Sequence, residues 1–440
     1  MPNTAVLTAR PGRFSNTFRS LRHRNYRYWF IGQTISLSGS WMQTMAQQVL
    51  IYRLTGSAAA LGLISFIGLI PLIPFSLWGG SLTDRMNKRD LIIATQVIML
   101  VQAVLLGVLA WTGKVQVWQV YVLSLMLAAV NAVDLPARQA FTVDMVEGKE
   151  DLTNAIGLNS AMFNLARALG PALAGLVVAA IGEGPAFIIN ALPFLPVILS
   201  LLLRRNLPAS SRPAAGRGRA SLDHVVGGLR YVRGQPVLML LISLVAVSAF
   251  LSMPYNTLMP VFADVVLAPS AQPVVHFICD GPTRIFSCQA PEALPLGMLL
   301  TAVGIGAVIG ALVVASMSEN AHRGRWLTFG NLGFPIVLLA TALNRSFLAA
   351  LILMAAVGVM FVWQNALANT LIQVTAPDEV RGRVMGLYTM VFQAFMRVGA
   401  LQAGLMSDWL SAPVSLGLGA VLSLAYGLWI ALFKPAVRRL

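Results

Sequence analysis

The chain has 440 residues, of which 57% are hydrophobic and only 11% charged, and its mean hydropathy is +0.75. This composition excludes nearly every class of water-soluble protein. A helix that crosses the hydrocarbon core of a bilayer needs about 20 apolar residues, and stretches of this kind account for most of the length. The sequence therefore predicts an all-α integral membrane protein without a sizeable soluble domain.

A basic arm, residues 1–27, comes first, and we expect it to lie in solvent beside the lipid surface. No small-residue cleavage site follows the arm, so the first apolar stretch is predicted to be a retained span and not a signal peptide. Twelve spans are predicted in chain order, at 28–52, 58–82, 90–112, 116–138, 153–181, 184–203, 236–263, 295–317, 326–344, 347–372, 384–408 and 411–433.

The net charge of +15 is interpreted as a signal of topology. In a soluble protein such a charge would indicate nucleic-acid binding, but here most of the 31 Lys and Arg residues fall in the segments on the same side of the membrane as the N-terminus. Cytoplasmic loops carry this excess. We expect a multi-pass monomer in a bacterial inner (plasma) membrane, with both termini cytoplasmic, the bilayer as a partner and no nucleic acid.

The longest connecting segment, residues 206–235, divides the spans into two sets of six. We expect an N-terminal bundle at 28–205, a cytoplasmic linker at 206–235 and a C-terminal bundle at 236–434. A shift of 229 positions supports two related halves, although chance similarity between apolar helices is the alternative. The glycine pairs that this shift superposes are Gly157 with Gly386, Gly170 with Gly399, and Gly175 with Gly404.

The loop after the second span resembles the signature loop of the major facilitator superfamily, G-x-L-A-D-R-x-G-R-K-x-x-L. Its matching residues are Gly80, Asp84, Arg85, Lys88 and Arg89. An ordinary basic turn is the alternative. The resemblance implies that Asp84 belongs to an inner gate, whose partners across the two halves would be Arg381 and Arg383.

Three further segments resemble the branch of that superfamily that contains the enterobactin exporter and the macrolide efflux pumps. They are residues 39–43, 164–175 and 377–385. The resemblance implies a twelve-helix fold of two pseudo-symmetric six-helix bundles. It also implies proton-driven export of a drug, a siderophore or a similar amphiphilic metabolite by alternating access. An uncoupled facilitator, a nutrient importer and a non-transporting membrane sensor or assembly factor are the alternatives.

Polar side chains recur at helical spacing in three spans that line the central cavity of the resembled family. Polar groups are costly against lipid, so these stripes are predicted to face a substrate; contacts between helices are the alternative reading. The predicted cavity residues are Gln33, Ser36, Ser40, Gln43, Gln47, Asn164, Ser252, Tyr255, Asn365, Asn369 and Gln373.

Three charged residues fall inside predicted spans and away from their boundary residues. Arg167 and Arg397 lie near the membrane midplane, where they meet an anionic substrate, lock the two halves together or bond backbone carbonyls at helix kinks. Asp134 is the only acid in any span, which makes it the candidate for proton coupling, with Arg167 as the partner of its ionised form. Asp134 also lies two residues before Pro136. The alternative role of its carboxylate is therefore to cap backbone groups where the proline interrupts the helix.

The only two cysteines, Cys279 and Cys288, lie in a predicted exterior loop, where an oxidising environment allows a disulfide. All four histidines fall in loops, which removes histidine as an intramembrane proton carrier. No nucleophile–base set and no metal-ligand cluster occurs in a suitable setting. We therefore expect no enzyme, no cofactor and no metal, with a small molecule and protons as the transported partners.

Overall fold

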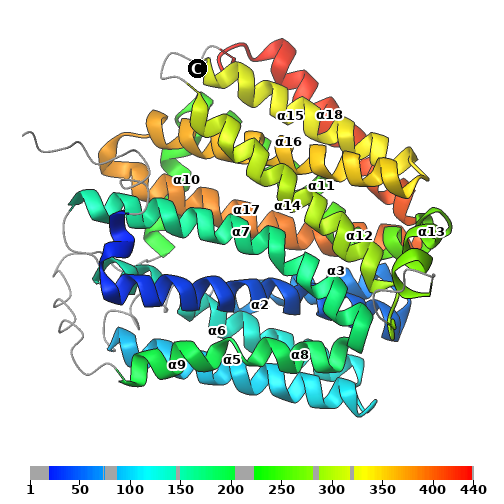
Figure 1. Ribbon diagram of the computed structural model, residues 1–440. Coiled ribbons are helices and arrows are strands. Elements are labelled where there is room, and N and C mark those ends of the chain that lie inside the picture. The colour runs from blue at the N-terminus through cyan, green and yellow to red at the C-terminus, as the bar shows by residue number, and fades with distance from the viewer. Residues whose placement is uncertain are drawn as a thin grey trace, which may run out of the picture.

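A computed structural model of the protein describes residues 19–72, 74, 87–144, 149–203, 222–280, 287–317 and 322–438. Every regular element among these residues is a helix (Figure 1), which confirms the all-α class. The elements of the N-terminal half of the chain are η1 (Arg19–Arg22), α2 (Arg24–Thr55), α3 (Ala58–Ile67), α5 (Lys88–Trp111), α6 (Val117–Asp144), α7 (Lys149–Ile181), α8 (Glu183–Ala191) and α9 (Phe194–Leu203).

The C-terminal half of the chain begins with a short linker helix and continues with long apolar helices. Its elements are α10 (Leu222–Arg233), α11 (Pro236–Leu251), α12 (Tyr255–Val261), the π-helix η2 (Phe262–Val266), α13 (Ala268–Cys279), α14 (Ala293–Ser316), α15 (Arg323–Leu343), α16 (Phe347–Thr375), α17 (Asp378–Trp409) and α18 (Ala412–Phe433).

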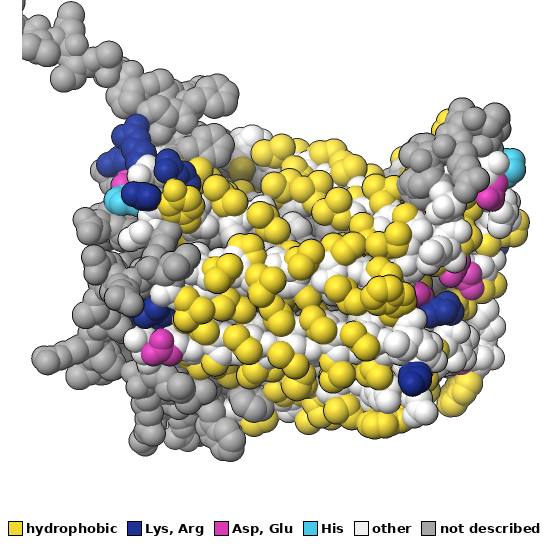
Figure 2. All heavy atoms as spheres, turned by 60° about the horizontal axis from the view of Figure 1, so that its bottom comes forward, with side chains coloured by type: hydrophobic (Ala, Val, Ile, Leu, Met, Phe, Trp, Pro, Cys, Tyr) yellow, Lys and Arg dark blue, Asp and Glu magenta, His cyan; other side chains and the backbone are white. Residues whose placement is uncertain are grey.

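Ten helices of the described residues are long and apolar enough to cross a membrane, and they correspond to the third to twelfth predicted spans. The first predicted span is α2, whose 32 residues reach about 48 Å. Glutamines and serines lower its hydropathy, so α2 is not among the ten. Figure 2 shows the face of the N-terminal half, where a broad band of hydrophobic side chains separates charged groups at the two ends. Such a band is what a bilayer requires.

The helices run between two ends of the molecule, which we name by the elements found there (Figure 1). The α10 end carries η1, α10 and the described C-terminal residues. The α13 end carries α13 and the junction of α2 with α3. At this junction α2 ends because Gly56 adopts the left-handed φ of 61° and donates its N–H to the carbonyl of Tyr52. The Ser57 hydroxyl then caps α3 by accepting from the Ala60 N–H.

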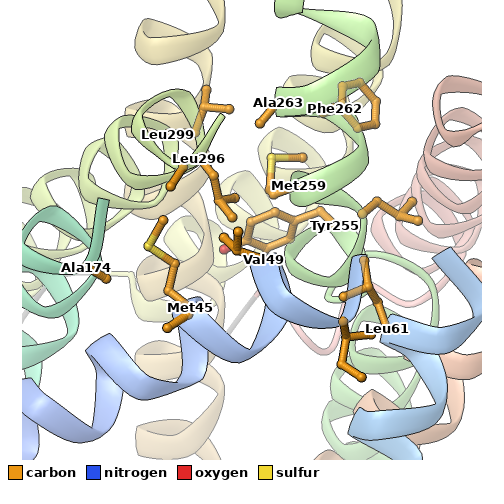
Figure 3. Close-up of a cluster of buried hydrophobic side chains, with 14 of the residues drawn as sticks. Met45, Val49, Leu61, Ala174, Tyr255, Met259, Phe262, Ala263, Leu296 and Leu299 are labelled. Atoms are coloured by element: carbon orange, nitrogen blue, oxygen red, sulfur yellow. The ribbon is translucent and has the colours of Figure 1, made fainter. Parts of the chain in front are cut away.

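At the α13 end, both halves of the chain contribute to a single hydrophobic core. Figure 3 shows Met45 and Val49 of α2 beside Tyr255 and Met259 of α12, with Leu296 of α14 close by. Burying apolar surface is worth roughly 25 cal/mol per Å², so this shared core holds the two halves together.

At the α10 end, the buried side chains form separate clusters that do not mix the two halves. One cluster joins α2, α5, α6, α7 and α9 around residues such as Trp29 and Phe141. Another joins α10, α11, α15, α16, α17 and α18 around residues such as Leu241 and Val384. Among the described residues, the two halves therefore share a core at the α13 end and not at the α10 end.

Candidate functional site

A pocket lies between the two halves, at the border of the shared core. Its walls come from α2 and α7 of the N-terminal half and from α12 and α14 of the C-terminal half. The lining residues are Trp41, Thr44, Met45, Gln48, Arg167, Pro171, Tyr255, Asn256, Leu300 and Val303. Two of the residues predicted from the sequence, Arg167 and Tyr255, are among them.

Arg167 reaches from α7 towards aromatic side chains of both halves. Its guanidinium carbon lies 4.8 Å from the ring centre of Phe361 on α16 and 6.0 Å from that of Trp41 on α2. Tyr255 of α12 borders the same pocket as Arg167. Such stacking is worth about 0.5–2 kcal/mol when the cation is desolvated. The aromatic rings hold the cation in place but do not neutralise it.

The aromatic ring of Tyr255 extends this contact into the C-terminal half. Tyr255 meets Phe334 edge to face at 6.1 Å, and Phe334 lies 6.1 Å from Phe361. Offset and edge-to-face pairs of this kind are the favoured arrangements. Aromatic side chains on three other helices therefore surround Arg167, and two of these helices, α12 and α16, belong to the opposite half.

The polar stripe predicted on α2 does not face the pocket. Its members turn into the N-terminal half, where they bond the neighbouring helices: the Gln43 amide donates to Gln102 on α5 at 2.7 Å, and the Gln47 amide donates to Ser124 on α6 at 3.0 Å. Asn190 on α8 donates to Gln43 at 2.5 Å. The predicted cavity role of these glutamines is thus replaced by the alternative, contact between helices.

The rest of the α2 stripe is buried in the same way. Gln33 and Ser36 are almost fully enclosed, and the hydroxyl of the half-buried Ser40 bonds the Ser36 carbonyl of its own helix. Helical periodicity gives the residues that share a face but not the neighbour that the face meets. The pocket takes the adjacent face of α2, which includes Trp41 and Gln48.

Other polar residues of the seventh and tenth spans bond within the C-terminal half, and the predicted cavity residue Ser252 is buried beside them without a hydrogen-bond partner among the described residues. Ser248 on α11 donates to Gln364 on α16 at 2.8 Å, and Gln364 donates to Asn331 on α15 at 2.7 Å. The hydroxyl of Ser252 is fully buried.

The remaining polar residues of the tenth span bond within α16 itself. Asn365 bonds the Phe361 carbonyl at 3.2 Å, and Gln373 bonds Asn369. Asn164 lies in α7, and its side chain is outside the described part of the chain.

Asp134 is buried and sits in a closed network near the α10 end. It pairs with Arg138 one turn further along α6, and it accepts from the Thr95 hydroxyl at 2.6 Å and from the Gln96 amide at 3.4 Å. Arg138 in turn bonds Gln33 of α2. The partner predicted for the ionised carboxylate was Arg167, which is wrong for this conformation because Arg138 lies on the same helix face.

Arg397 differs from Arg167 in its setting, although the sequence shift places the two only one position apart. Its guanidinium crosses from α17 to α3, where it lies against Gly68 and reaches the Ser65 carbonyl at 3.5 Å. The contact agrees with two of the predicted alternatives, because the cation bonds a backbone carbonyl and connects the two halves. The structure does not bring Arg397 into the pocket.

The signature loop is described only at its end. Gly80, Asp84 and Arg85 lie outside the described residues. Lys88 begins α5 after Asn87, whose side chain accepts from the Arg89 N–H at 3.0 Å. The Arg89 side chain bonds the Leu201 carbonyl of α9 at 2.7 Å, where a cation also suits the negative end of the helix dipole.

The two arginines predicted to meet Asp84 are held within the C-terminal half. Arg381 donates to the carbonyls of Gln373 and Ala376 at the end of α16 and pairs with Asp378 at 2.5 Å. The segment around Arg383 packs against Gly228 of α10.

A hydrogen-bonded latch connects the halves at the α13 end. The Asp408 carboxylate at the end of α17 accepts from the Ala58 and Ala59 N–H groups at 2.7 and 3.1 Å, and from the Ser57 hydroxyl at 2.5 Å. Carboxylates are favoured at helix N-termini because the unpaired N–H groups and the helix dipole attract negative charge. Residues of the C-terminal half thus cap a helix of the N-terminal half. Sequence analysis did not single out Asp408.

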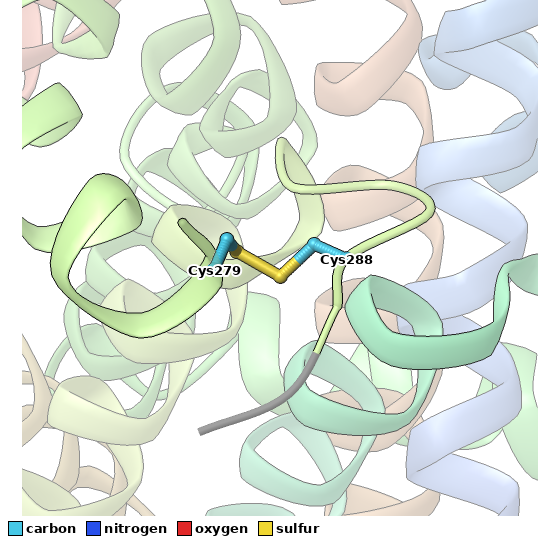
Figure 4. The surroundings of a disulfide bond; sticks show 2 residues. All are labelled: Cys279 and Cys288. Atoms are coloured by element: carbon cyan, nitrogen blue, oxygen red, sulfur yellow. A yellow bond between two sulfur atoms is a disulfide. The ribbon is translucent and has the colours of Figure 1, made fainter. Parts of the chain in front are cut away.

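The disulfide loop forms a second connection between the halves at this end. The structure joins Cys279, the last residue of α13, to Cys288 (Figure 4). The next two residues, Gln289 and Ala290, donate their backbone N–H groups to the Ala179 carbonyl of α7 at 2.7 and 3.1 Å. The disulfide loop is therefore fastened to the opposite half.

Charged side chains lie near the disulfide loop. Arg53 at the end of α2 pairs with the buried Glu183 at 2.8 Å. Burial raises the pKa of the Glu292 carboxyl above its ordinary value, and the negative charges of Glu183 and Asp264 add to the rise.

Comparison with known proteins decides the family. The chain matches the transmembrane secretion effector family of the major facilitator superfamily over residues 15–275 and 286–438. It belongs to this family. The chain is 26% identical to the multidrug efflux pump Tap of Mycolicibacterium fortuitum, over 92% of this chain and 94% of that protein. It is 21% identical to the staphyloferrin A transporter of Staphylococcus aureus, over 87% and 89%.

A further relative and two solved structures agree with this family. The chain is 22% identical to macrolide efflux protein A of Streptococcus pyogenes, over 87% of this chain and 89% of that protein. The fold resembles the nucleoside transporter NupG, with a TM-score of 0.70 at 13% identity, over 93% and 99% of the two chains. It also resembles a bacterial Spinster homologue in an inward-facing conformation, with a TM-score of 0.64 at 15% identity, over 95% and 97%. The protein is thus a multi-pass membrane protein of a transporter family.

Proposed function

We propose that the protein exports a small amphiphilic molecule, such as a drug or a siderophore, by alternating access between two six-helix halves, residues 28–205 and 236–434. The observation that carries the proposal is the contrast between the ends: the halves share one core at the α13 end and have separate cores at the α10 end. The pocket with Arg167 lies where the shared core begins. A ligand bound there meets both halves, as rocking of one bundle against the other requires.

The charge distribution supports a cytoplasmic α10 end. Arg22, Arg27, Arg89, Arg233 and Arg325 lie at or near this end, whereas Arg53, Lys114 and Arg345 lie at the opposite one. Lys and Arg accumulate in cytoplasmic segments. The conformation described here is accordingly the inward-facing state, and the disulfide lies outside the cell, where it is stable.

Proton coupling through Asp134 is the finer part of the proposal. An acid in a span serves this purpose when it is protonated in one facing state and released in the other. In the inward-facing state Asp134 is paired with Arg138. We expect the outward-facing state to separate the pair, so that Asp134 takes up a proton from the exterior.

An uncoupled facilitator is the second candidate, and the same ion pair favours it. A carboxylate that keeps Arg138 as its partner in both states stays ionised and carries no proton. The variant Asp134→Asn separates the candidates in membrane vesicles. If Asp134 couples export to protons, the variant loses pH-driven accumulation of the substrate while downhill exchange continues. If accumulation is unchanged, Asp134 is not the coupling residue.

The gate proposed for Asp84 is tested separately. Asp84→Asn is expected to favour the inward-facing state, because a contact specific to the other state is lost. Normal transport together with unchanged labelling of a cysteine at the α10 end would exclude the gate. The general test of function is a substrate panel in inside-out vesicles with and without a pH gradient. A membrane sensor moves none of these compounds, and an importer moves them in the opposite direction.

A further inference from the structure

Arg167 has no counter-ion among the residues that the structure describes. Its contacts there are the rings of Phe361 and Trp41, and Tyr255 lines the same pocket; none of the three carries negative charge at neutral pH. Two unit charges attract or repel several-fold more strongly in a protein interior than in water. A cation in a span therefore calls for an anion, and intramembrane charges usually mark the ligand path.

The part of the chain that the structure describes offers no anion for this position. Asp134 is the only acid in the interior of a predicted span, and it is held by Arg138, Thr95 and Gln96 in the N-terminal half. Two acids at the α13 end are engaged in other contacts: Glu183 pairs with Arg53, and Asp408 caps α3. The polar neighbours of Arg167 in the pocket, which include Thr44, Gln48 and Asn256, are all neutral.

The pocket encloses only about 30 Å³ in this conformation, so an organic ligand would enter it as the two halves move apart. Arg167 itself favours a specific kind of partner. A guanidinium that stacks on an aromatic face keeps N–H donors along its edge, and these donors fit a carboxylate or a similar planar anion in a two-point contact. The rest of the lining is aromatic and aliphatic: Trp41, Met45, Leu300 and Val303 all border the pocket. Aromatic rings suit this surface because they pack by offset or edge-to-face contact.

We propose that the pocket binds aromatic organic anions, with Arg167 as the residue that selects for negative charge. This inference rests on the proposed function and names the substrate class of the same site. A cationic ligand is disfavoured because it would meet an unneutralised guanidinium at short range. Arg397 takes no part, since its guanidinium bonds the Ser65 carbonyl at the contact of α3 with α17.

The test compares two ligands that share a ring system and differ in charge. Binding of 2-naphthoate and of its neutral analogue 2-naphthamide is measured by calorimetry on the full-length purified protein. We expect the wild type to prefer the anion by about tenfold or more, the ratio that one charged hydrogen-bonded contact supplies. Arg167→Gln should bind the two ligands equally, whereas Arg167→Lys should retain part of the preference.

Matched variants make the outcome specific. Arg397→Gln removes the other arginine of the corresponding span and should leave the preference unchanged. Phe361→Leu keeps the charge of Arg167 and removes a ring, so binding of both ligands should weaken while their ratio persists. Equal binding by the wild type, no binding of the anion at millimolar concentration, or a preference that survives in a folded Arg167→Gln would each overturn the proposal.

The result is independent of transport. If the anion binds preferentially but nothing is moved in vesicles, the proposed export is wrong and the anion site stands. If cationic dyes are moved and anions are not, export stands and the anion site is wrong.

Discussion

The α13 end and the α10 end are built from the same long helices, yet among the described residues the two halves share a core only at the α13 end. On α7, a Cβ atom added to Gly175 would lie 2.9 Å from the Cα of Gly297 on α14, whereas one added to Gly157 would meet nothing within 4 Å. On α17, Gly404 touches Ala58 of α3, and Gly386 is again open. Glycine permits two helix backbones to approach closely. The contrast shows that the tertiary packing decides which glycines make such a contact.

This comparison also supports the internal repeat. Glycines superposed by the sequence shift make corresponding contacts: Gly175 and Gly404 each face a helix of the other half. Gly170 and Gly399 each meet the first helix of their own half, at Trp41 of α2 and Phe250 of α11 respectively. The closed end is thus closed by two related seams, α7 with α14 and α3 with α17.

The largest expected effect comes from filling one of these seams. Gly175→Leu forces backbone apart where the helices touch, and overpacking of this kind costs up to about 3 kcal/mol. We expect a cysteine introduced for Leu61, a buried residue of the shared core, to become reactive to a thiol reagent. The two native cysteines form a disulfide and do not react with the reagent, so the signal comes from the introduced cysteine.

The matched control lies on the same helix. Gly157→Leu adds the same side chain at an open position, so the Leu61→Cys probe should stay protected and the thermal stability should not fall. If both variants expose the probe equally, the seam is not what closes the α13 end.

The disulfide is expected to contribute the next largest effect. Replacing Cys279 and Cys288 by serine removes a short covalent ring, which costs about 2 to 3 kcal/mol of unfolding free energy in the chain-entropy model. Thermal unfolding in detergent, with and without reductant, measures this loss. Full alkylation of both thiols in intact, non-reduced cells would show that the bond does not form.

A smaller effect is expected from the latch. Asp408→Asn removes the charge and one acceptor at the N-terminus of α3, and losing such a cap typically costs about 1 kcal/mol. The Leu61→Cys probe should then react about fivefold faster. Asp264→Asn is the control, since it removes an exposed charge from the same end without touching α3. Equal rates in the two variants would contradict the latch.

The smallest expected effect concerns pH. The folded-state pKa of Glu292 is raised above the ordinary value of 4.5, so the folded protein holds this proton more firmly than the unfolded chain. Stability should therefore fall as the pH rises from 4.5 through the raised pKa. Glu292→Gln should remove this component, which is small because the carboxyl is only half-buried. Parallel melting-temperature curves for wild type and variant would show that Glu292 does not contribute.

The sequence alone determined the membrane class, the family and most of the span positions. Ten predicted spans reappear as long apolar helices because continuous hydrophobicity over about 20 residues has few other solutions. The signature-loop motif indicated the superfamily, and the glycine repeat indicated two related halves, without any contact being known. These are local signals, which the chain carries in its residue order.

Tertiary structure decided which residues form the pocket. Gln43 and Gln47 do share one face of α2. That face packs inside the N-terminal half, where it bonds Gln102, Asn190 and Ser124 of other helices. Arg167 and Arg397 stand one repeat position apart, and one position is about 100° of helix rotation. That rotation points one arginine into the pocket and the other at α3. Periodicity fixes which residues share a face; only the packing of the other helices decides what each face meets.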